Sequence, residues 1–199
     1  MTSHAVAVCL ITVFAGVAVS PVSSQTPPAP KAAKAAPASK VGPVAPPSTD
    51  AEKIKSALSA APAAIAKDAT VMDMPSMKVL RPGTSGWTCL PDGPSPGVDP
   101  MCLDKNGMEW AGAWMGHKDP PKDKMGIGYM LMGGSDASNT DPFAEKPAAG
   151  GTWVDTGPHM MVLNISDRFA GYPTSAANTK VPYVMFANTP FAHLMIPIK

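Results

Sequence analysis

Methionine and histidine are the residue types in this chain whose spacing could support metal chemistry. The 199 residues include 14 methionines but only 5 phenylalanines and 3 tyrosines, and thioether sulfur is a soft ligand that selects Cu(I). His159 precedes Met161 by two residues in an apolar segment, and His193 precedes Met195 in the same way. Residues two apart in a strand share a face, so these four could form a copper site if their strands are neighbours. The alternative is core packing, because methionine also fills irregular interiors.

A polar loop, GGSDASNTDP (133–142), directly follows an apolar run and offers a second candidate site. Polar loops at strand ends commonly carry binding groups. The candidate ligand-binding residues are Ser135, Asp136, Asn139, Asp141 and His159. The side-chain oxygens of Asp136, Asn139 and Asp141 would suit Ca²⁺, but Ser138 and Thr140 break the alternation of acidic and amide residues that an EF-hand loop requires. The alternative is that these side chains hydrogen-bond their own backbone in turns.

The sequence lacks the motifs of the common enzyme classes. It contains no P-loop, no dinucleotide-binding glycine motif and no zinc-protease helix, and GGS at 133–135 is not a nucleophile elbow. Ser135, Asp136 and His159 could be assembled as a hydrolase triad, but no spacing favours them, and the catalytic residues stay unknown. The sequence favours a non-enzymatic module that binds a small molecule or an envelope component. A periplasmic copper-binding protein is the first alternative, and a secreted hydrolase is the second.

Two cysteines, Cys89 and Cys102, lie in the part of the chain expected to fold. An even pair in an oxidising compartment indicates one disulfide, and a separation of thirteen does not match the C-x-x-C spacing of redox dithiols. The bridge would close a loop of about 14 residues and contribute about 3 kcal/mol in the chain-entropy model.

The N-terminal part of the chain indicates export to the periplasm or the medium. An apolar stretch at 5–19 followed by small residues predicts a signal peptide over 1–24, which would remove Cys9. Residues 25–48 are rich in Pro, Ala and Lys and predict a disordered linker, and 49–199 would form a single domain. The apolar stretch is shorter than the roughly 20 residues of a membrane span, so no stable span is expected after cleavage.

The charge balance limits the class of partner. A formal net charge of +1 and the lack of a basic stripe argue against nucleic-acid binding. The expected partner is therefore a small molecule or another envelope component. The sequence does not fix an oligomeric state.

Local patterns predict an α+β fold. Thr49 and Glu52 form a capping-box pattern ahead of a helix that Pro62 should end or kink, and Asp104 can cap a second helix reaching about Gly116. Short apolar runs bounded by Gly, Pro and Asn predict strands. The expected strand segments are 70–74, 77–80, 127–132, 160–163, 183–187 and 194–198. Helices come early and strands late, which favours a mainly antiparallel sheet of about five short strands covered by one or two helices.

Three long motifs carry a resemblance to known proteins. GWTCLPD, DPMCLDKNGMEW and GYMLMGGSDASNTDP resemble segments of a group of small secreted bacterial proteins. The resemblance runs from about Ile54 to the final HLMIPI. It implies export and a single domain, and it carries over no activity and no catalytic residues.

Overall fold

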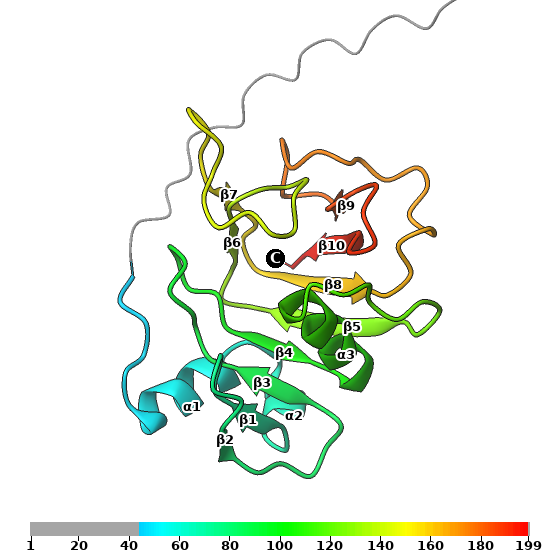
Figure 1. The fold of residues 1–199 in the computed structure, drawn as a ribbon. Helices are drawn as coiled ribbons and strands as arrows, with labels where there is room; N and C mark the ends of the chain where they lie inside the picture. Colours follow the sequence, from blue (N-terminus) through cyan, green and yellow to red (C-terminus); the bar gives the residue numbers. More distant parts are fainter. Residues whose placement is uncertain (1–43, 199) are drawn as a thin grey trace, which may run out of the picture. The chain divides into compact units, whose positions relative to one another are not determined.

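Strand pairing dominates the part of the chain that the computed structural model describes, residues 44–198 (Figure 1). These residues form a mixed α+β fold with a large sheet. The expected signal peptide (1–24) and residues 25–43 of the expected linker lie outside the described residues, as does Lys199.

The main sheet has eight strands in the order β2-β1-β3-β4-β5-β8-β10-β9. Within it, β1 and β3 run parallel, and the other neighbours are antiparallel. Two further short strands, β6 and β7, pair with each other. The strands are β1 (Thr70–Met72), β2 (Val79–Arg81), β3 (Thr88–Leu90), β4 (Met101–Leu103), β5 (Gly126–Met130), β6 (Ser135–Asp136), β7 (Val154–Asp155), β8 (His159–Leu163), β9 (Tyr183–Met185) and β10 (His193–Pro197).

The expectation of about five strands was wrong. The six expected segments correspond to β1, β2, β5, β8, β9 and β10, but β3 and β4 were missed. Both strands lie beside proline- and glycine-rich sequence that predicts irregular structure, although they are no shorter than β1, β2 and β9. β6 and β7 were missed because they are two residues long and largely polar.

Residues 44–198 contain three helices, α1 (Asp50–Leu58), α2 (Ala63–Ala66) and α3 (Lys105–Met115). The capping box of α1 forms as expected: Glu52 N–H donates to the Thr49 hydroxyl, and Thr49 N–H donates to the Glu52 carboxylate. α1 ends before Pro62, which becomes the N-cap of α2. Asp104 caps α3 by accepting from Gly107 N–H at 2.7 Å.

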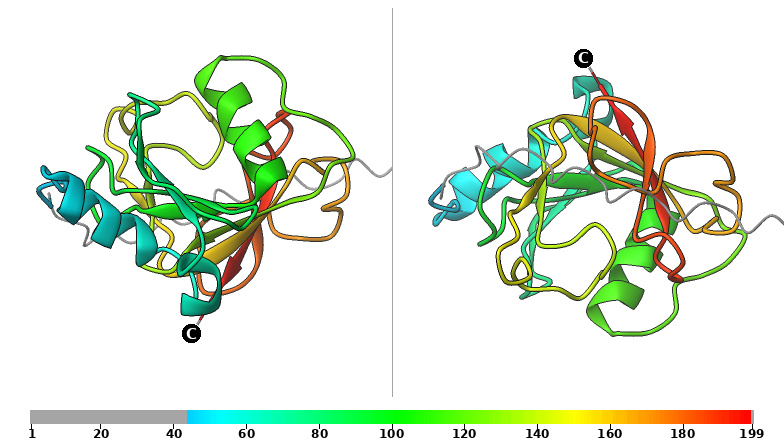
Figure 2. Two further views of the ribbon diagram at one scale, coloured as in Figure 1. Left: turned by 90° about the horizontal axis from the view of Figure 1, so that it is seen from below. Right: turned by 90° about the horizontal axis from the view of Figure 1, so that it is seen from above.

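The two faces of the sheet are covered by different helices. Cys102 and Leu103 are consecutive in β4, so their side chains point to opposite faces. Cys102 packs with Cys89 and with Ala57 of α1, whereas Leu103 packs with Trp110 and other residues on the α3 side. The two further views show α1 and α3 on opposite sides of the sheet (Figure 2).

The expected disulfide between Cys89 and Cys102 is present. The two cysteines are directly opposite each other in the β3–β4 register, and both are fully buried on the α1 side. The bridge therefore staples two very short strands in the middle of the sheet.

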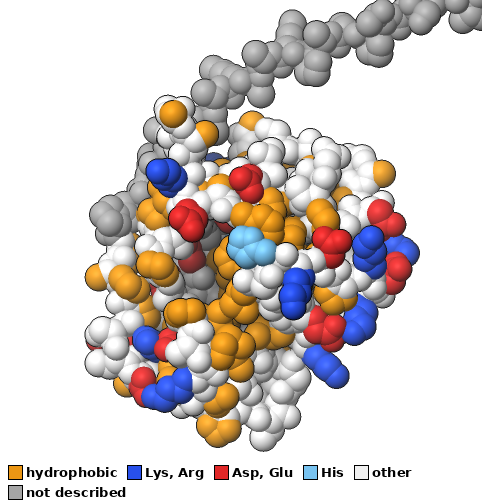
Figure 3. All heavy atoms as spheres, in the orientation of Figure 1, with side chains coloured by type: hydrophobic (Ala, Val, Ile, Leu, Met, Phe, Trp, Pro, Cys, Tyr) orange, Lys and Arg blue, Asp and Glu red, His pale blue; other side chains and the backbone are white. Residues whose placement is uncertain are grey.

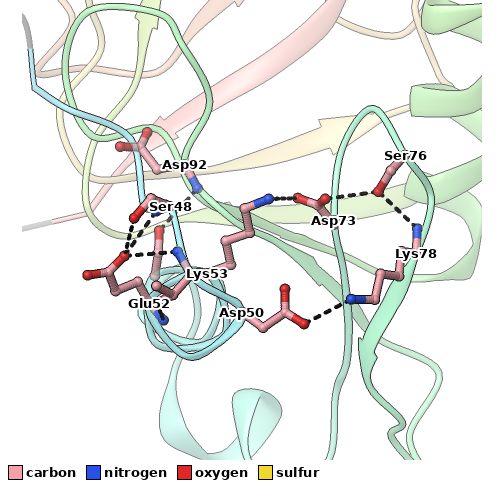
Figure 4. A network of polar contacts seen from close by, with 10 residues as sticks. Ser48, Asp50, Glu52, Lys53, Asp73, Ser76, Lys78 and Asp92 are labelled. Carbon is pink, nitrogen blue, oxygen red and sulfur yellow. Dashed lines mark hydrogen bonds and ion pairs between the residues drawn. The ribbon is translucent and has the colours of Figure 1, made fainter.

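A polar network ties α1 to the turn between β1 and β2 (Figure 4). Lys53 Nζ lies 2.9 Å from Asp73 Oδ1, and Lys78 Nζ lies 2.9 Å from Asp50 Oδ2. The first pair is partly buried and the second is exposed, so the first should matter more for stability. Asp73 is followed by Met74, whose side chain lines the cavity described below.

No helix within residues 44–198 is long and apolar enough to cross a membrane.

Candidate functional site

A cavity of about 270 Å³ lies between the sheet and α3. Trp110, Ala111 and Trp114 contribute to its wall from α3. Figure 3 shows apolar side chains gathered on the face of the molecule on which α3 lies. Seven methionines of the described chain line it: Met74, Met101, Met115, Met130, Met161, Met185 and Met195. His159, His193, Asp99 and Asp136 are the titratable lining residues.

Three cross-strand pairs form the sheet wall of the cavity. Met130 of β5 is opposite His159 of β8, Met161 of β8 is opposite Met195 of β10, and Met185 of β9 is opposite His193 of β10. Directly opposed side chains have Cβ atoms about 4.5–5.5 Å apart.

The four residues expected as copper ligands therefore share one wall. The register sets His159 opposite Pro197, however, and His193 opposite Met185. The two imidazoles thus lie at opposite ends of the wall, with the Met161–Met195 pair between them.

His159 is held in one tautomer by a backbone contact. Its Nδ1 lies 2.7 Å from the Gly157 carbonyl oxygen, which can only accept, so Nδ1 carries the proton and Nε2 carries a lone pair. Nε2 is buried and has no hydrogen-bond partner. Burial lowers the pKa of His159. The hydrogen bond to the Gly157 carbonyl raises the pKa, but by less, so the net shift is downward. The imidazole is therefore neutral at neutral pH.

His193 repeats this arrangement in a more enclosed place. Its Nδ1 lies 2.9 Å from the Phe191 carbonyl, and its ring makes edge contacts with Trp110 and Phe186 at centroid distances of 5.3 and 5.4 Å. Burial lowers the pKa of His193 to about 4, with a smaller lowering from the charge of His159. Its ring is fixed by aromatic packing as well as by the hydrogen bond.

Two carboxyl groups form the acidic part of the cavity lining. Ser135 donates to Asp99 Oδ2 at 3.0 Å and also to the Pro96 carbonyl, and Asp99 Oδ1 is buried without a partner. Burial raises the pKa of Asp136 to about 7, and the negative charge of Asp99 adds to this. Burial also raises the pKa of Asp99, although hydrogen bonds from Ser95 and Ser135 oppose it.

The polar loop is divided between the cavity and ordinary turn contacts. Asp136 lines the cavity, and Ser135 lies behind it, bonded to Asp99. The Asn139 side-chain amide donates to the Thr174 carbonyl, and the Asn139 backbone carbonyl accepts from Phe186 N–H at 2.8 Å. Asp141 accepts from Phe143 N–H at 2.9 Å in a local turn. The loop is thus anchored to Thr174 and to the residue after β9, and neither Asn139 nor Asp141 lines the cavity.

The residues considered for a hydrolase triad are not connected. The Ser135 hydroxyl donates to Asp99 and Pro96, while His159 Nε2 has no partner and Nδ1 is engaged with Gly157. An activated serine requires a base within hydrogen-bond reach of its hydroxyl. Ser135 has a carboxylate there and no imidazole.

Sequence reasoning missed several lining residues. Asp99 begins the DPMCLDKNGMEW segment, but it belongs to no known catalytic or binding motif. Trp110 and Trp114 of α3 are four residues apart and lie on the same side of the helix. Met130 and Met132 are two residues apart, but only Met130 lines the cavity, and Met132 is 50% exposed.

Comparisons with known proteins do not identify the site, because no family model, curated protein or solved structure matches the chain. Among residues 44–198, no group of three or more His, Cys, Asp or Glu side chains could hold a metal ion.

Proposed function

We propose that this protein is an exported, non-enzymatic module that binds a small ligand in the cavity between α3 and the sheet. The observation that carries the proposal is the cavity lining, which is mostly thioether and aromatic, with two carboxyl groups and an imidazole that has a free lone pair. Apolar concave sites with a few converging polar groups are the usual form of small-molecule sites.

The size of the cavity limits the ligand. About 270 Å³ is at the small end of ligand pockets, so a single ring system, a short chain or a metal ion fits, and a polymer segment does not. Trp114 and Met115 line the cavity and are 41% and 37% exposed, so they place the entrance at the C-terminal end of α3.

Export is supported by the disulfide. The Cys89–Cys102 bridge is compatible with an oxidising compartment, where such bonds persist. The predicted signal peptide over 1–24 and the resemblance to secreted bacterial proteins support the same location, periplasmic or extracellular.

The proposal can be tested with methionine methyl groups as probes. In protein labelled at the methionine methyl carbon, a panel of small aromatic compounds, short alcohols and alkylammonium ions should shift the cavity resonances, including those of Met130, Met161 and Met185. The exposed residues Met77, Met125 and Met132 serve as internal controls that should not move.

A pair of variants separates cavity binding from surface binding. Ala111→Phe fills the cavity from α3 and should abolish the shifts, whereas Ala113→Phe, on the same helix but outside the cavity, should leave them unchanged. Shifts that persist in folded Ala111→Phe, or a panel that moves no cavity methyl, would contradict the proposal.

A further inference from the structure

The Met130–His159 pair brings a thioether and an imidazole together on the cavity wall. The two residues are directly opposite in the β5–β8 register. A Cβ placed on Gly134 would lie 2.5 Å from Thr156 Oγ1, 3.1 Å from Cε1 of His159 and 3.3 Å from the methyl carbon of Met130. Cε1 lies between the two ring nitrogens, and the methyl carbon is bonded to sulfur. The ends of both side chains therefore lie beside the same backbone position, where a side chain would clash.

The second observation is the unpaired nitrogen of His159. Its Nδ1 donates to the Gly157 carbonyl, and its Nε2 lone pair is buried with no partner, in a side chain only 1% exposed. A buried acceptor left unpaired destabilises the fold, and a bound ligand would remove that cost. Metal-bound histidines characteristically donate their other ring N–H to a backbone carbonyl or carboxylate, which is the arrangement seen here.

Two more methionines extend this pair into a larger donor set. Met161 lies two residues after His159 and shares its face of β8. Met101 precedes Cys102, which is opposite Tyr129, so the antiparallel register sets Met101 beside Met130. Both line the same cavity. The set is three thioethers and one neutral imidazole, and it contains no hard oxygen donor.

We propose that Met130 and His159 bind Cu(I), with Met101 and Met161 completing the ligand set. This inference rests on the proposed function, because it names the ligand class of the same cavity. Thioether and imidazole donors favour Cu(I) over Zn²⁺, which is usually held with thiolate or carboxylate, and over Ca²⁺ or Mg²⁺, which need oxygen. The carboxyl groups of Asp99 and Asp136 in the same lining offset the charge of the cation.

The experiment is a titration of the full chain with Cu(I) against the chelator bicinchoninate. The chain carries Cys9→Ser so that no free thiol competes, and ascorbate keeps copper reduced while the Cys89–Cys102 bridge stays closed. One Cu(I) should bind with sub-micromolar affinity, and X-ray absorption of the loaded protein should show sulfur and nitrogen neighbours.

Matched variants locate the site. Met130→Leu keeps the volume of the side chain and should weaken Cu(I) binding about tenfold or more, and His159→Leu should weaken it further. Met125→Leu removes an exposed methionine outside the cavity and is the matched control, which should bind Cu(I) as the parent does. Near-UV circular dichroism verifies that each variant is folded.

Three results would overturn the proposed Cu(I) site. They are binding of Cu(I) no tighter than micromolar, equal affinities of Met130→Leu and Met125→Leu for Cu(I), and coordination of the bound copper by oxygen alone. Cavity methyl shifts with the organic panel would persist in that case, because they do not depend on Met130. Failure of the copper site is therefore distinguishable from failure of the cavity as a ligand site.

Discussion

Ser135 donates a hydrogen bond of 3.0 Å to Asp99, across 36 residues of sequence, and this bond fixes the position of Asp136 one residue later. The contact joins the segment before β4 to β6. It sets two carboxyl groups in one cavity lining, close enough for the charge of Asp99 to raise the pKa of Asp136. The acidic part of the cavity thus depends on a contact between two segments that are far apart in the chain.

The first prediction concerns Asp136→Asn. The carboxyl has a pKa of about 7 in the folded protein against an ordinary value of 3.8, so the folded state holds its proton more tightly than the unfolded state does. Its contribution to stability is therefore lost as the pH rises from about 4 to about 7, and the loss is at most about 4 kcal/mol. The free energy of unfolding of Asp136→Asn should equal that of the parent at pH 4 and exceed it at pH 8.

Urea unfolding at both pH values measures this difference. The measured quantity is the difference in free energy of unfolding between variant and parent at each pH. This difference is needed because the pKa values of His159 and His193 are lowered, so both histidines make the folded state more stable as the pH rises. Asp141→Asn, at an exposed turn carboxyl of the same loop, is the matched substitution against which the Asp136→Asn difference is compared. If the difference in free energy of unfolding between Asp136→Asn and the parent is the same at pH 4 and pH 8, the pKa of Asp136 is not raised in the folded protein.

The second prediction concerns the disulfide. Replacing Cys89 and Cys102 together by alanine should lower the free energy of unfolding by about 2–5 kcal/mol, since the bridge is buried and connects two three-residue strands. The shift of the urea midpoint measures the loss. Intact mass of the purified oxidised protein is the companion measurement, and a mass that shows both residues as free thiols would exclude the bridge.

The third prediction compares two glycines. A Cβ on Gly126 would lie 2.6 Å from the backbone nitrogen of Gly107, where α3 crosses β5, so Gly126→Ala should separate helix and sheet and destabilise the fold by about 2 kcal/mol or more. Gly112 of α3 has nothing within 4 Å of its Cβ position, so Gly112→Ala should stabilise by up to about 1 kcal/mol. Thermal unfolding of both variants checks the opposite signs, and equal effects would contradict the close approach.

The fourth prediction concerns the start of α1. Thr49→Ala removes the hydroxyl that accepts from Glu52 N–H and should cost about 1 kcal/mol. Thr49→Ser keeps the acceptor and should cost much less, which makes it the matched control. Chemical denaturation gives both values. A Thr49→Ala variant as stable as Thr49→Ser would show that the cap does not contribute.

Local features of this fold were predictable from the sequence. The capping box at Thr49, the cap at Asp104 and the bridge between Cys89 and Cys102 each depend on residue types close to the feature that they form. The apolar runs likewise gave the longer strands. The strand count was wrong because β3 and β4 are stabilised by the disulfide and by their neighbours rather than by their own pattern.

The candidate site was predictable only in part. Alternation along β8 and β10 placed His159 with Met161 and His193 with Met195 on shared faces, and the structure shows all four lining one cavity. The register between strands is a property of the whole sheet, so the sequence could not show that Met130 is the neighbour of His159. For the same reason Asp99 was missed, since only tertiary contacts bring it near Asp136.

Among the strands of residues 44–198, β10 comes last in the chain, yet it lies between β8 and β9 and supplies both His193 and Met195. Synthesis proceeds from the N-terminus, so this wall of the cavity cannot close until β10 has left the ribosome. Until then β8 and β9 lack their shared partner, and the methionine-rich wall is among the last parts of the sheet to form.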